Sequence, residues 1–267
     1  MPNFSANLGF LWQELSLPDA IRAAKEAGFD AVECHWPYDV PVDAVRQALR
    51  ETGFVMVSLN TRQGINGPAD FGVNAMPGRE AEARAYIDEA VAYAASIGCL
   101  CINAPAGKTG GTAAAESVYR ANLAYASAAA APHGITVLVE PINQRDAPGY
   151  HVSRMEQAIA TIEAVGADNL KLLFDCYHTQ ISQGDLIRRL EAARPYLGHI
   201  QLAGVPLRQE PDVGEVSYRD ILAAIDAMGW GGYVGAEYRP RGTTDEGLNW
   251  LRAWGRRGRQ GSEVEAK

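Results

Sequence analysis

The sequence predicts an α/β protein with a single domain, a (β/α)8 TIM barrel. Short apolar runs typical of strands recur eight times along the chain, and amphipathic helical patterns separate them. This alternation indicates parallel strands joined by helical crossovers. The 267 residues also match the usual length of one such barrel. An open doubly wound sheet is the rival, but it usually carries a G-x-G-x-x-G turn after an early strand, and the chain has none.

The elements follow one another at regular spacing. We predict strands at 4–8, 31–35, 55–60, 99–103, 135–140, 170–175, 199–202 and 233–237. Three helices have clear limits, at 80–97, 153–165 and 217–228, and a glycine follows each of them. Ser153 and Glu156 have the spacing of a capping box for the second of these helices. The barrel is expected to span 1–254, and the polar, aperiodic segment 255–267 is expected to be a disordered C-terminal tail.

Composition narrows the range of partners. The net charge is −8, which argues against nucleic acid or an anionic membrane as the main partner. No segment approaches the roughly 18 apolar residues of a membrane-spanning helix. The N-terminal segment lacks a signal-peptide pattern, and the four cysteines lie in or beside apolar strand-like runs. A cytoplasmic location with reduced, mostly buried cysteines is therefore expected.

The last four predicted strands carry oxygen donors at or near their ends, namely Glu140, Asp175, Gln201 and Glu237. Side chains at the carboxyl ends of barrel strands converge on one mouth. Carboxylates held close together in an apolar mouth repel one another unless protons or a cation neutralise them. One such residue alone is better explained as a helix cap or a loop polar group, but four in succession favour one divalent metal. Oxygen ligands suit Mg²⁺ or Mn²⁺ better than Zn²⁺.

Three further residues are candidates for substrate binding. His178 follows Asp175 by three residues and has either a structural or a substrate-facing role. Lys108 is either a solvated loop lysine or an anchor for a substrate carboxylate or hydroxyl. Its Gly-Lys-Thr triplet is not a P-loop, because Ile102 occupies the position of the first glycine. Arg208 follows the seventh strand, in a loop that either closes over a substrate or is plain surface. Aromatic residues near the early strand ends form either a pocket wall or core: Phe10, Trp12, Trp36 and Tyr38.

Five short stretches together resemble the hydroxypyruvate isomerase family, within the xylose-isomerase-like barrels. They are Met76-Pro77-Gly78-Arg79-Glu80, Glu140-Pro141-Ile142-Asn143, Asp175-Cys176-Tyr177-His178, Gly198-His199-Ile200-Gln201 and Gly235-Ala236-Glu237-Tyr238. The resemblance covers nearly the whole chain. It implies that Glu140, Asp175, Gln201 and Glu237 bind the metal and that Glu140 and Glu237 are also the catalytic acid/base pair. It also implies that His178 and Lys108 face the substrate.

The resemblance implies a metal-dependent isomerisation of the aldose–ketose type through an enediolate. Hydroxypyruvate would become 2-hydroxy-3-oxopropanoate (tartronate semialdehyde), with Lys108 or Arg208 holding the substrate carboxylate. The family carries a Gly-Asp-Trp segment after the third strand, where this chain reads Asn60-Thr61-Arg62. Because that loop borders the expected pocket, a 2-oxo-tetronate or a ketose epimerised at carbon 3 stays open as the substrate. Ketose 3-epimerases resemble this chain but have histidine at the position of Gln201, which favours the isomerase branch.

Two other classes of protein are weaker alternatives. A zinc-dependent endonuclease on the same barrel needs a histidine-rich site and a basic surface, whereas this chain has five histidines and a net charge of −8. A non-catalytic sugar-binding barrel does not need two glutamates flanking one metal. The expected partner is therefore a small hydroxy-oxo acid or sugar, and a homo-oligomer is neither indicated nor excluded.

Overall fold

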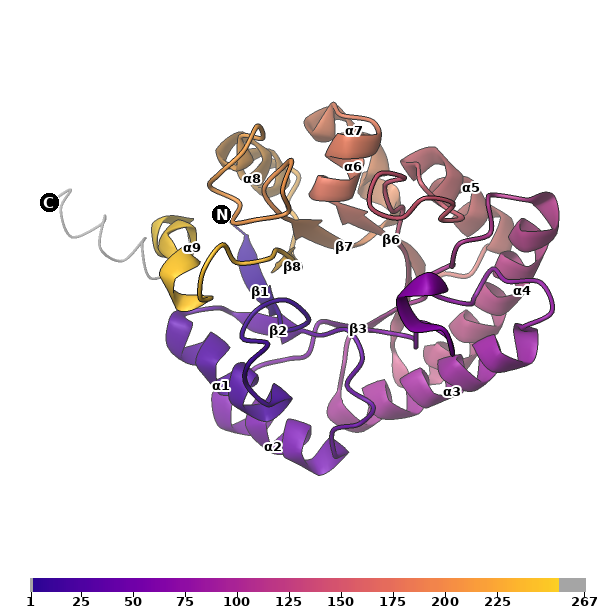
Figure 1. Ribbon diagram of the computed structural model, residues 1–267, viewed down its shortest axis with the longest axis horizontal. Helices are drawn as coiled ribbons and strands as arrows, with labels where there is room; N and C mark the ends of the chain where they lie inside the picture. The colour runs from indigo at the N-terminus through magenta and orange to yellow at the C-terminus, as the bar shows by residue number, and fades with distance from the viewer. Residues whose placement is uncertain (1, 255–267) are drawn as a thin grey trace, which may run out of the picture.

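The computed structural model describes residues 2–254, in which eight parallel strands form a barrel inside a ring of helices (Figure 1). The strands are β1 (Asn3–Asn7), β2 (Ala31–Glu33), β3 (Ser58–Asn60), β4 (Cys101–Asn103), β5 (Thr136–Val139), β6 (Leu170–Asp175), β7 (Leu197–Leu202) and β8 (Tyr233–Ala236). They pair in the order β2-β1-β8-β7-β6-β5-β4-β3. The Val57 N–H donates to Val32 O at 2.7 Å, which brings the two ends of this order together. The predicted fold class is confirmed, and the predicted tail at 255–267 lies outside the described residues.

Helices follow the strands and cover the outside of the barrel (Figure 1). They are α1 (Leu17–Ala27), α2 (Val42–Thr52), α3 (Glu80–Ile97), α4 (Ala113–Ala130), α5 (Met155–Val165), α6 (Cys176–Ser182), α7 (Leu186–Ala193), α8 (Tyr218–Ala227) and α9 (Asn249–Trp254). The limits of α3 are those predicted, and Gly98 after it adopts the left-handed conformation (φ 71°) that ends many helices. Helix α8 is one residue shorter at each end than predicted.

The start of α5 differs from the prediction. The helix begins at Met155, so the residue that precedes it is Arg154 rather than Ser153. The Oε1 atom of Gln157 accepts the backbone N–H groups of Ser153 and Arg154 at 3.0 and 3.1 Å. The proposed Ser153–Glu156 box is therefore wrong, and Glu156 pairs with Arg189 at 2.6 Å instead. When the helix begins one residue later, the capping role passes to the next side chain.

Inside the barrel, an apolar layer supports a polar one. Cys101, Leu138 and Leu173 form a small buried cluster of their own. Side chains two residues apart on a strand lie on the same face. Each residue of this cluster is followed, two positions later along the chain, by a buried polar residue: Asn103, Glu140 and Asp175 respectively. The alternation thus sets three polar side chains above an apolar floor, at the carboxyl ends of β4, β5 and β6.

The cysteines and the helices bear on two predictions from the sequence. The four cysteines are free, and all are buried. No helix among residues 2–254 combines the length and the apolar character needed to cross a membrane. The prediction of free, buried cysteines is confirmed.

Trp250, on helix α9, packs against the barrel and offers a test of how much this contact contributes to stability. It is 1 % exposed, and its ring makes edge-to-face contacts with Phe4, Phe29 and Tyr238 at centroid distances of 5.3, 5.9 and 6.0 Å. Trp250→Ala should lower the free energy of unfolding by about 3–5 kcal/mol, since it leaves a cavity that aromatic rings cannot fill. Denaturant unfolding measures this. Ile65→Ala, at a side chain that is 77 % exposed, should change stability by less than about 0.5 kcal/mol; equal effects would contradict the packing role.

Candidate active site

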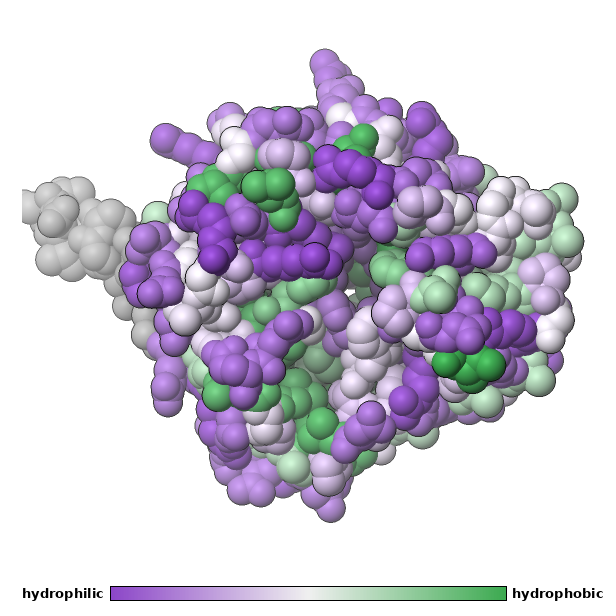
Figure 2. Space-filling view, in the orientation of Figure 1, coloured by the Kyte–Doolittle hydropathy of each residue, from purple (hydrophilic) through white to green (hydrophobic). Residues whose placement is uncertain are grey.

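A cavity of about 300 Å³ opens at the carboxyl ends of the strands. Glu140, His178, Arg208 and Glu237 line it together with aromatic side chains that include Phe10. Figure 2 shows this face hollowed near its centre, with hydrophilic and hydrophobic residues both bordering the hollow. A recess that combines an apolar wall with a few charged groups is the usual form of a small-molecule site.

Two of the carboxylates are held by neighbouring donors. The Glu140 Oε2 atom accepts from the side-chain amide of Asn103 at 2.7 Å. The Asp175 Oδ1 atom accepts the backbone N–H of Tyr177 at 2.7 Å, since Asp175 caps the start of α6. The other oxygen, Asp175 Oδ2, is buried and has no hydrogen-bond partner among the described residues. One oxygen of each carboxylate is therefore fixed by the fold, and the other remains for a ligand.

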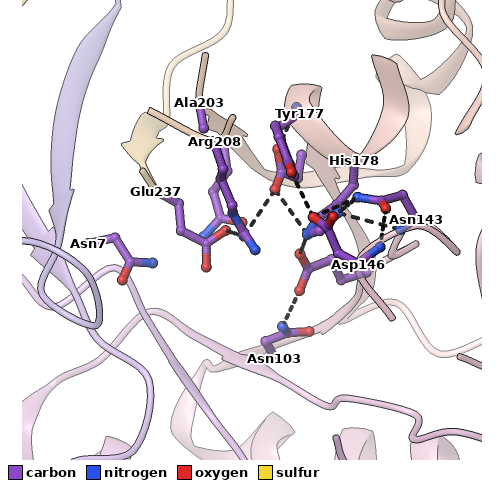
Figure 3. A network of polar contacts seen from close by, with 12 residues as sticks. Asn7, Asn103, Asn143, Asp146, Tyr177, His178, Ala203, Arg208 and Glu237 are labelled. Carbon is purple, nitrogen blue, oxygen red and sulfur yellow. Dashed lines mark hydrogen bonds and ion pairs between the residues drawn. The ribbon is translucent and has the colours of Figure 1, made fainter. Parts of the chain in front are cut away.

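The third carboxylate, Glu237, lies between an arginine and a histidine side chain. Arg208 approaches its Oε2 atom at 2.7 Å, and the His35 Nε2 atom lies 3.0 Å from its Oε1 atom. Arg208 also lies 3.7 Å from Asp175 Oδ2. Figure 3 shows the Arg208 and Glu237 side chains converging from the β7–β8 side of the barrel, opposite His178. The guanidinium thus partly neutralises two of the three carboxylates.

These surroundings separate the carboxyl pKa values. Burial raises the pKa of Glu140 well above its ordinary value, and the charges of Glu237 and Asp175 raise it further. Burial and the charge of Glu237 likewise raise the pKa of Asp175 to about 7. Burial acts in the same sense on Glu237, but Arg208 and His35 outweigh it and lower the pKa to about 2. Neighbouring carboxyl groups with opposite shifts are typical of acid/base chemistry.

The donor set fits a divalent cation. Glu140, Asp175 and His178 each offer a ligand atom, and these atoms lie within 4.8 Å of one another. Asp175 Oδ2 and Gln201 Oε1 are buried oxygens without a hydrogen-bond partner in the described chain. Gln201 pairs with Asp175 in the β6–β7 register, so their side chains share one face. Hard oxygen atoms that lack partners, next to several carboxylates, match the ligands of Mg²⁺ or Mn²⁺.

The hydrogen bonds of His178 specify its tautomer. The backbone N–H of Asp146 donates to Asn143 Oδ1 at 2.8 Å, so the Asn143 amide nitrogen faces His178 Nδ1 at 2.6 Å (Figure 3). His178 Nδ1 is thus an acceptor. Burial and the nearby Arg208 lower the histidine pKa to about 3, which keeps the ring neutral. The proton of the neutral ring is therefore on Nε2, which lies 3.5 Å from Asp175 Oδ2. In this tautomer, the Nε2–H group of His178 is a hydrogen-bond donor toward the cavity.

Most of the residues singled out from the sequence come together in the structure. Asp175 and Gln201 are buried and are not among the residues that line the cavity. Lys108 lies at the rim, where its Nζ atom donates to the Pro68 carbonyl at 3.1 Å and lies 5.7 Å from the centre of the Phe71 ring. Both of these neighbours line the cavity. The structure thus leaves the substrate contact of Lys108 as a prediction.

The structure adds lining residues that the sequence analysis missed, among them His35, Asn103 and Arg239. The first two end predicted strands, so their positions were as suggestive as those of the residues that were chosen. The sequence interpretation missed them because it rested on the oxygen donors at the ends of the last four strands. Of the aromatic candidates, Phe10 and Trp36 line the cavity, whereas Tyr38 packs against Tyr93 at 5.8 Å. A search of all eight strand ends for polar side chains would have found His35 and Asn103.

Fold and site together define the class of protein. A family model described as a xylose isomerase-like TIM barrel matches residues 21–254. The chain therefore belongs to the xylose isomerase-like TIM barrel family.

Individual relatives narrow the comparison. A 2-oxo-tetronate isomerase of Cupriavidus necator is 42% identical over 257 residues, which cover 95% of this chain and 99% of the relative. A putative hydroxypyruvate isomerase of Homo sapiens is 41% identical over 266 residues, 96% of each chain. A solved structure described as an AP endonuclease, family 2, from Brucella melitensis has a TM-score of 0.91 and 38% identity, and covers 95% of this chain and 99% of that one. The resemblance drawn from the five sequence stretches is confirmed.

The raised carboxyl pKa values predict how pH acts on the metal-free protein. Between the ordinary pKa of an aspartate, 3.8, and its folded pKa of about 7, Asp175 binds more proton when folded than when unfolded. The stability of chelator-treated protein should therefore fall as pH rises from about 5 to about 8. Mn²⁺ should remove this slope, since a cation stabilises the ionised carboxylates and displaces their protons. Melting temperatures across this range, with calorimetry of proton release, measure both effects. If the dependence of stability on pH were the same with and without Mn²⁺, these carboxylates would not bind the cation.

Proposed function

We propose that this protein is a metal-dependent isomerase that moves a proton between adjacent carbons of a short hydroxy-oxo acid, with hydroxypyruvate as the first candidate. The observation that carries the proposal is the pair of buried glutamates, Glu140 and Glu237, which line one cavity and have pKa values shifted in opposite directions. Relatives that are 41–42% identical are named as isomerases of hydroxypyruvate and of 2-oxo-tetronate. The isomerase class is common to both names.

The metal part of the proposal rests on the oxygen donors. Glu140, Asp175, Gln201 and Glu237 would hold one divalent cation, Mg²⁺ or Mn²⁺. When bound, it would supply Lewis acidity to the substrate carbonyl and the neighbouring hydroxyl.

The side chains of the protein then divide the proton transfer. Glu237, held ionised by Arg208 and His35, is the group that removes the proton from the hydroxymethyl carbon. Loss of that proton yields the enediolate of the acid. Glu140, fixed by Asn103, delivers a proton to the adjacent carbon, while the proton of the terminal hydroxyl passes to the former carbonyl oxygen, so that the terminal carbon becomes the new carbonyl. The Nε2–H of His178 faces the same space and donates a hydrogen bond to a substrate oxygen.

The size and charge of the cavity favour a small acid. A volume of about 300 Å³ accommodates a molecule of three or four carbons together with a cation. Arg208 and Arg239 both line it and supply positive charge for a carboxylate. A 2-oxo-tetronate is therefore the second candidate, supported by the relative that carries that name. A ketose lacks the carboxylate and comes third.

The first experiment strips the protein with a chelator and restores Mg²⁺, Mn²⁺, Co²⁺ or Zn²⁺ one at a time. Proton NMR in deuterated water follows hydroxypyruvate, a 2-oxo-tetronate and a ketose in parallel. Metal-dependent conversion of hydroxypyruvate, with deuterium entering beside the carbonyl, is the expected result. Turnover of the tetronate or the ketose alone would retain the chemistry and change the substrate. Inactivity on all three with metal bound, or cleavage of a duplex with an abasic site, would overturn the proposal.

A cytoplasmic location and the absence of a nucleic acid or membrane partner stay predictions.

A further inference from the structure

A fully buried carboxylate, Glu33, lies inside the barrel beneath the candidate site. It is 0 % exposed and lies outside the residues that line the cavity. Its Oε1 atom accepts from Asn7 Nδ2 at 2.9 Å and from Gln201 Nε2 at 2.7 Å. Its Oε2 atom accepts from Ser5 Oγ at 3.1 Å and lies 2.6 Å from His199 Nε2. A buried carboxylate is costly unless neighbouring groups satisfy it in this way, so the arrangement requires an explanation.

The barrel leaves room for this carboxylate at Gly235. A β-carbon at Gly235 would lie 2.6 Å from both carboxylate oxygens of Glu33, closer than real side chains come. In the strand register, Gly235 lies between Ser5 on β1 and Gln201 on β7. The Glu33 side chain thus extends from β2 across the position that Gly235 leaves empty and reaches β7. A side chain at Gly235 would separate Glu33 from Gln201.

The contact determines which way the Gln201 amide points. Gln201 Nε2 donates to the carboxylate oxygen Oε1 of Glu33, so the amide presents its NH₂ group to Glu33. Because the amide is planar, its carbonyl oxygen then faces the other way. That atom, Gln201 Oε1, is buried and has no hydrogen-bond partner in the described part of the chain. The same side chain is paired in register with Asp175, whose Oδ2 atom is also buried without a partner.

We propose that Glu33 is a positioning residue that fixes the Gln201 amide with its carbonyl oxygen toward the metal site. The inference rests on the proposed function, since it assumes that Gln201 is a metal ligand. An amide nitrogen is no ligand for a hard cation, so an amide turned by half a revolution contributes nothing to binding. Glu33 removes that alternative without touching the substrate. Groups that orient metal ligands in this way typically change metal affinity by about 10- to 100-fold when they are replaced.

The nearby donors allow a matched control. Asn7 Oδ1 accepts the Gly9 N–H at 2.9 Å, so the Asn7 amide nitrogen is fixed as a donor toward Glu33. Ser5 and His199 have a hydroxyl that rotates and a ring that changes tautomer, so both can accept instead. Glu33→Gln should therefore place its NH₂ group toward Ser5 and His199 and keep its oxygen toward Gln201. This variant removes the charge and keeps the orienting contact, whereas Glu33→Met removes both.

The test measures Mn²⁺ affinity without substrate, by electron paramagnetic resonance of the free ion. Glu33→Met should weaken binding by about 10- to 100-fold, and Glu33→Gln by less than about threefold. In a Gln201→Leu background, Glu33→Met should cause no further loss, because the ligand it orients is absent. Glu33→Asp, which keeps the charge but draws the carboxylate back from Gln201, should also weaken binding and serves if Glu33→Met fails to fold.

Each outcome bears on a different claim. Native affinity in Glu33→Met or Glu33→Asp would overturn the inference, as would losses that multiply in the double variant or an equal loss in Glu33→Gln. If the native protein binds Mn²⁺ but converts none of the acids, the proposed function fails while the positioning role is still decided by the affinities. A native protein that binds no divalent metal overturns both.

Discussion

Glu237→Gln and Glu140→Gln should each reduce kcat by about 10²- to 10⁴-fold while the barrel stays folded. A glutamine keeps the size and the hydrogen-bonding oxygen of each side chain but cannot take up or release a proton at neutral pH, and positioned acid/base groups contribute rate factors of this size. Glu237 is the stronger case, because Arg208 and His35 hold its pKa at about 2 against the effect of burial. A carboxylate kept ionised in this way is available as a base throughout the neutral range.

Steady-state turnover and deuterium exchange separate the two roles. Loss of deuterium incorporation in Glu237→Gln is expected if it removes the proton, whereas Glu140→Gln should retain some exchange of the substrate hydrogen. Glu51→Gln is the matched control, since Glu51 is exposed on α2, where it pairs with Arg22 at 2.8 Å. Near-native turnover in both cavity variants, with metal bound, would sink the acid/base assignment. Equal losses in Glu51→Gln would indicate general damage rather than chemistry.

Much of the barrel could be predicted because its signals are local. A strand buried on both faces is a short continuous apolar run, and a glycine after an amphipathic helix marks its end. The limits of α3 at Glu80 and Ile97 were predictable for this reason. The oxygen donors of the site were predictable too, since barrel topology assigns strand ends to one mouth. The position of Glu140, Asp175 and Glu237 at strand ends was therefore sufficient to predict that they lie at the mouth.

The side-chain partners could not be predicted, because they depend on contacts between distant strands. Residue 33 reads as a buried strand position, and nothing in its neighbours along the chain indicates that it reaches Gln201, which lies 168 residues away. The tautomer of His178 depends in the same way on an amide fixed by a loop 35 residues earlier. The start of α5 shows that local signals also fail: Ser153 and Glu156 have the spacing of a capping box, yet the residue that precedes the helix is Arg154. Periodicity gives the face of a side chain, but not the partner that it meets there.

Arg208 combines two functions in one side chain, and its replacement should have the second large effect. Its guanidinium lies 2.7 Å from Glu237 and 3.7 Å from Asp175, and it is stacked between Phe10 and Tyr177 at 4.9 and 5.1 Å. The backbone holds it in a left-handed conformation, with φ 56°, that non-glycine residues rarely adopt. Such a conformation persists only where the surroundings require it. The position of the charge is therefore a built feature of the site.

Arg208→Met keeps the length of the side chain and its contacts with the rings, but leaves buried carboxylates without their cation. Metal-free protein should lose about 3–5 kcal/mol of unfolding free energy, the usual effect of breaking a buried ion pair from one side. Mn²⁺ should recover most of this loss, since it neutralises the same carboxylates. KM for hydroxypyruvate should still rise by roughly 10- to 100-fold, because charge-assisted hydrogen bonds to a carboxylate contribute about 1.5–3 kcal/mol.

Denaturant unfolding with and without Mn²⁺, together with steady-state kinetics, distinguishes the two functions. Arg239→Met is the matched control, because Arg239 lines the same cavity from an exposed position. It should raise KM without changing metal-free stability by more than about 0.5 kcal/mol. If Arg208→Met destabilised the metal-free and metal-loaded proteins equally, the guanidinium would not be neutralising the carboxylates that bind the cation. If KM were unchanged, Arg208 would serve the carboxylates of the protein alone, and Arg239 would be left to hold the carboxylate of the substrate.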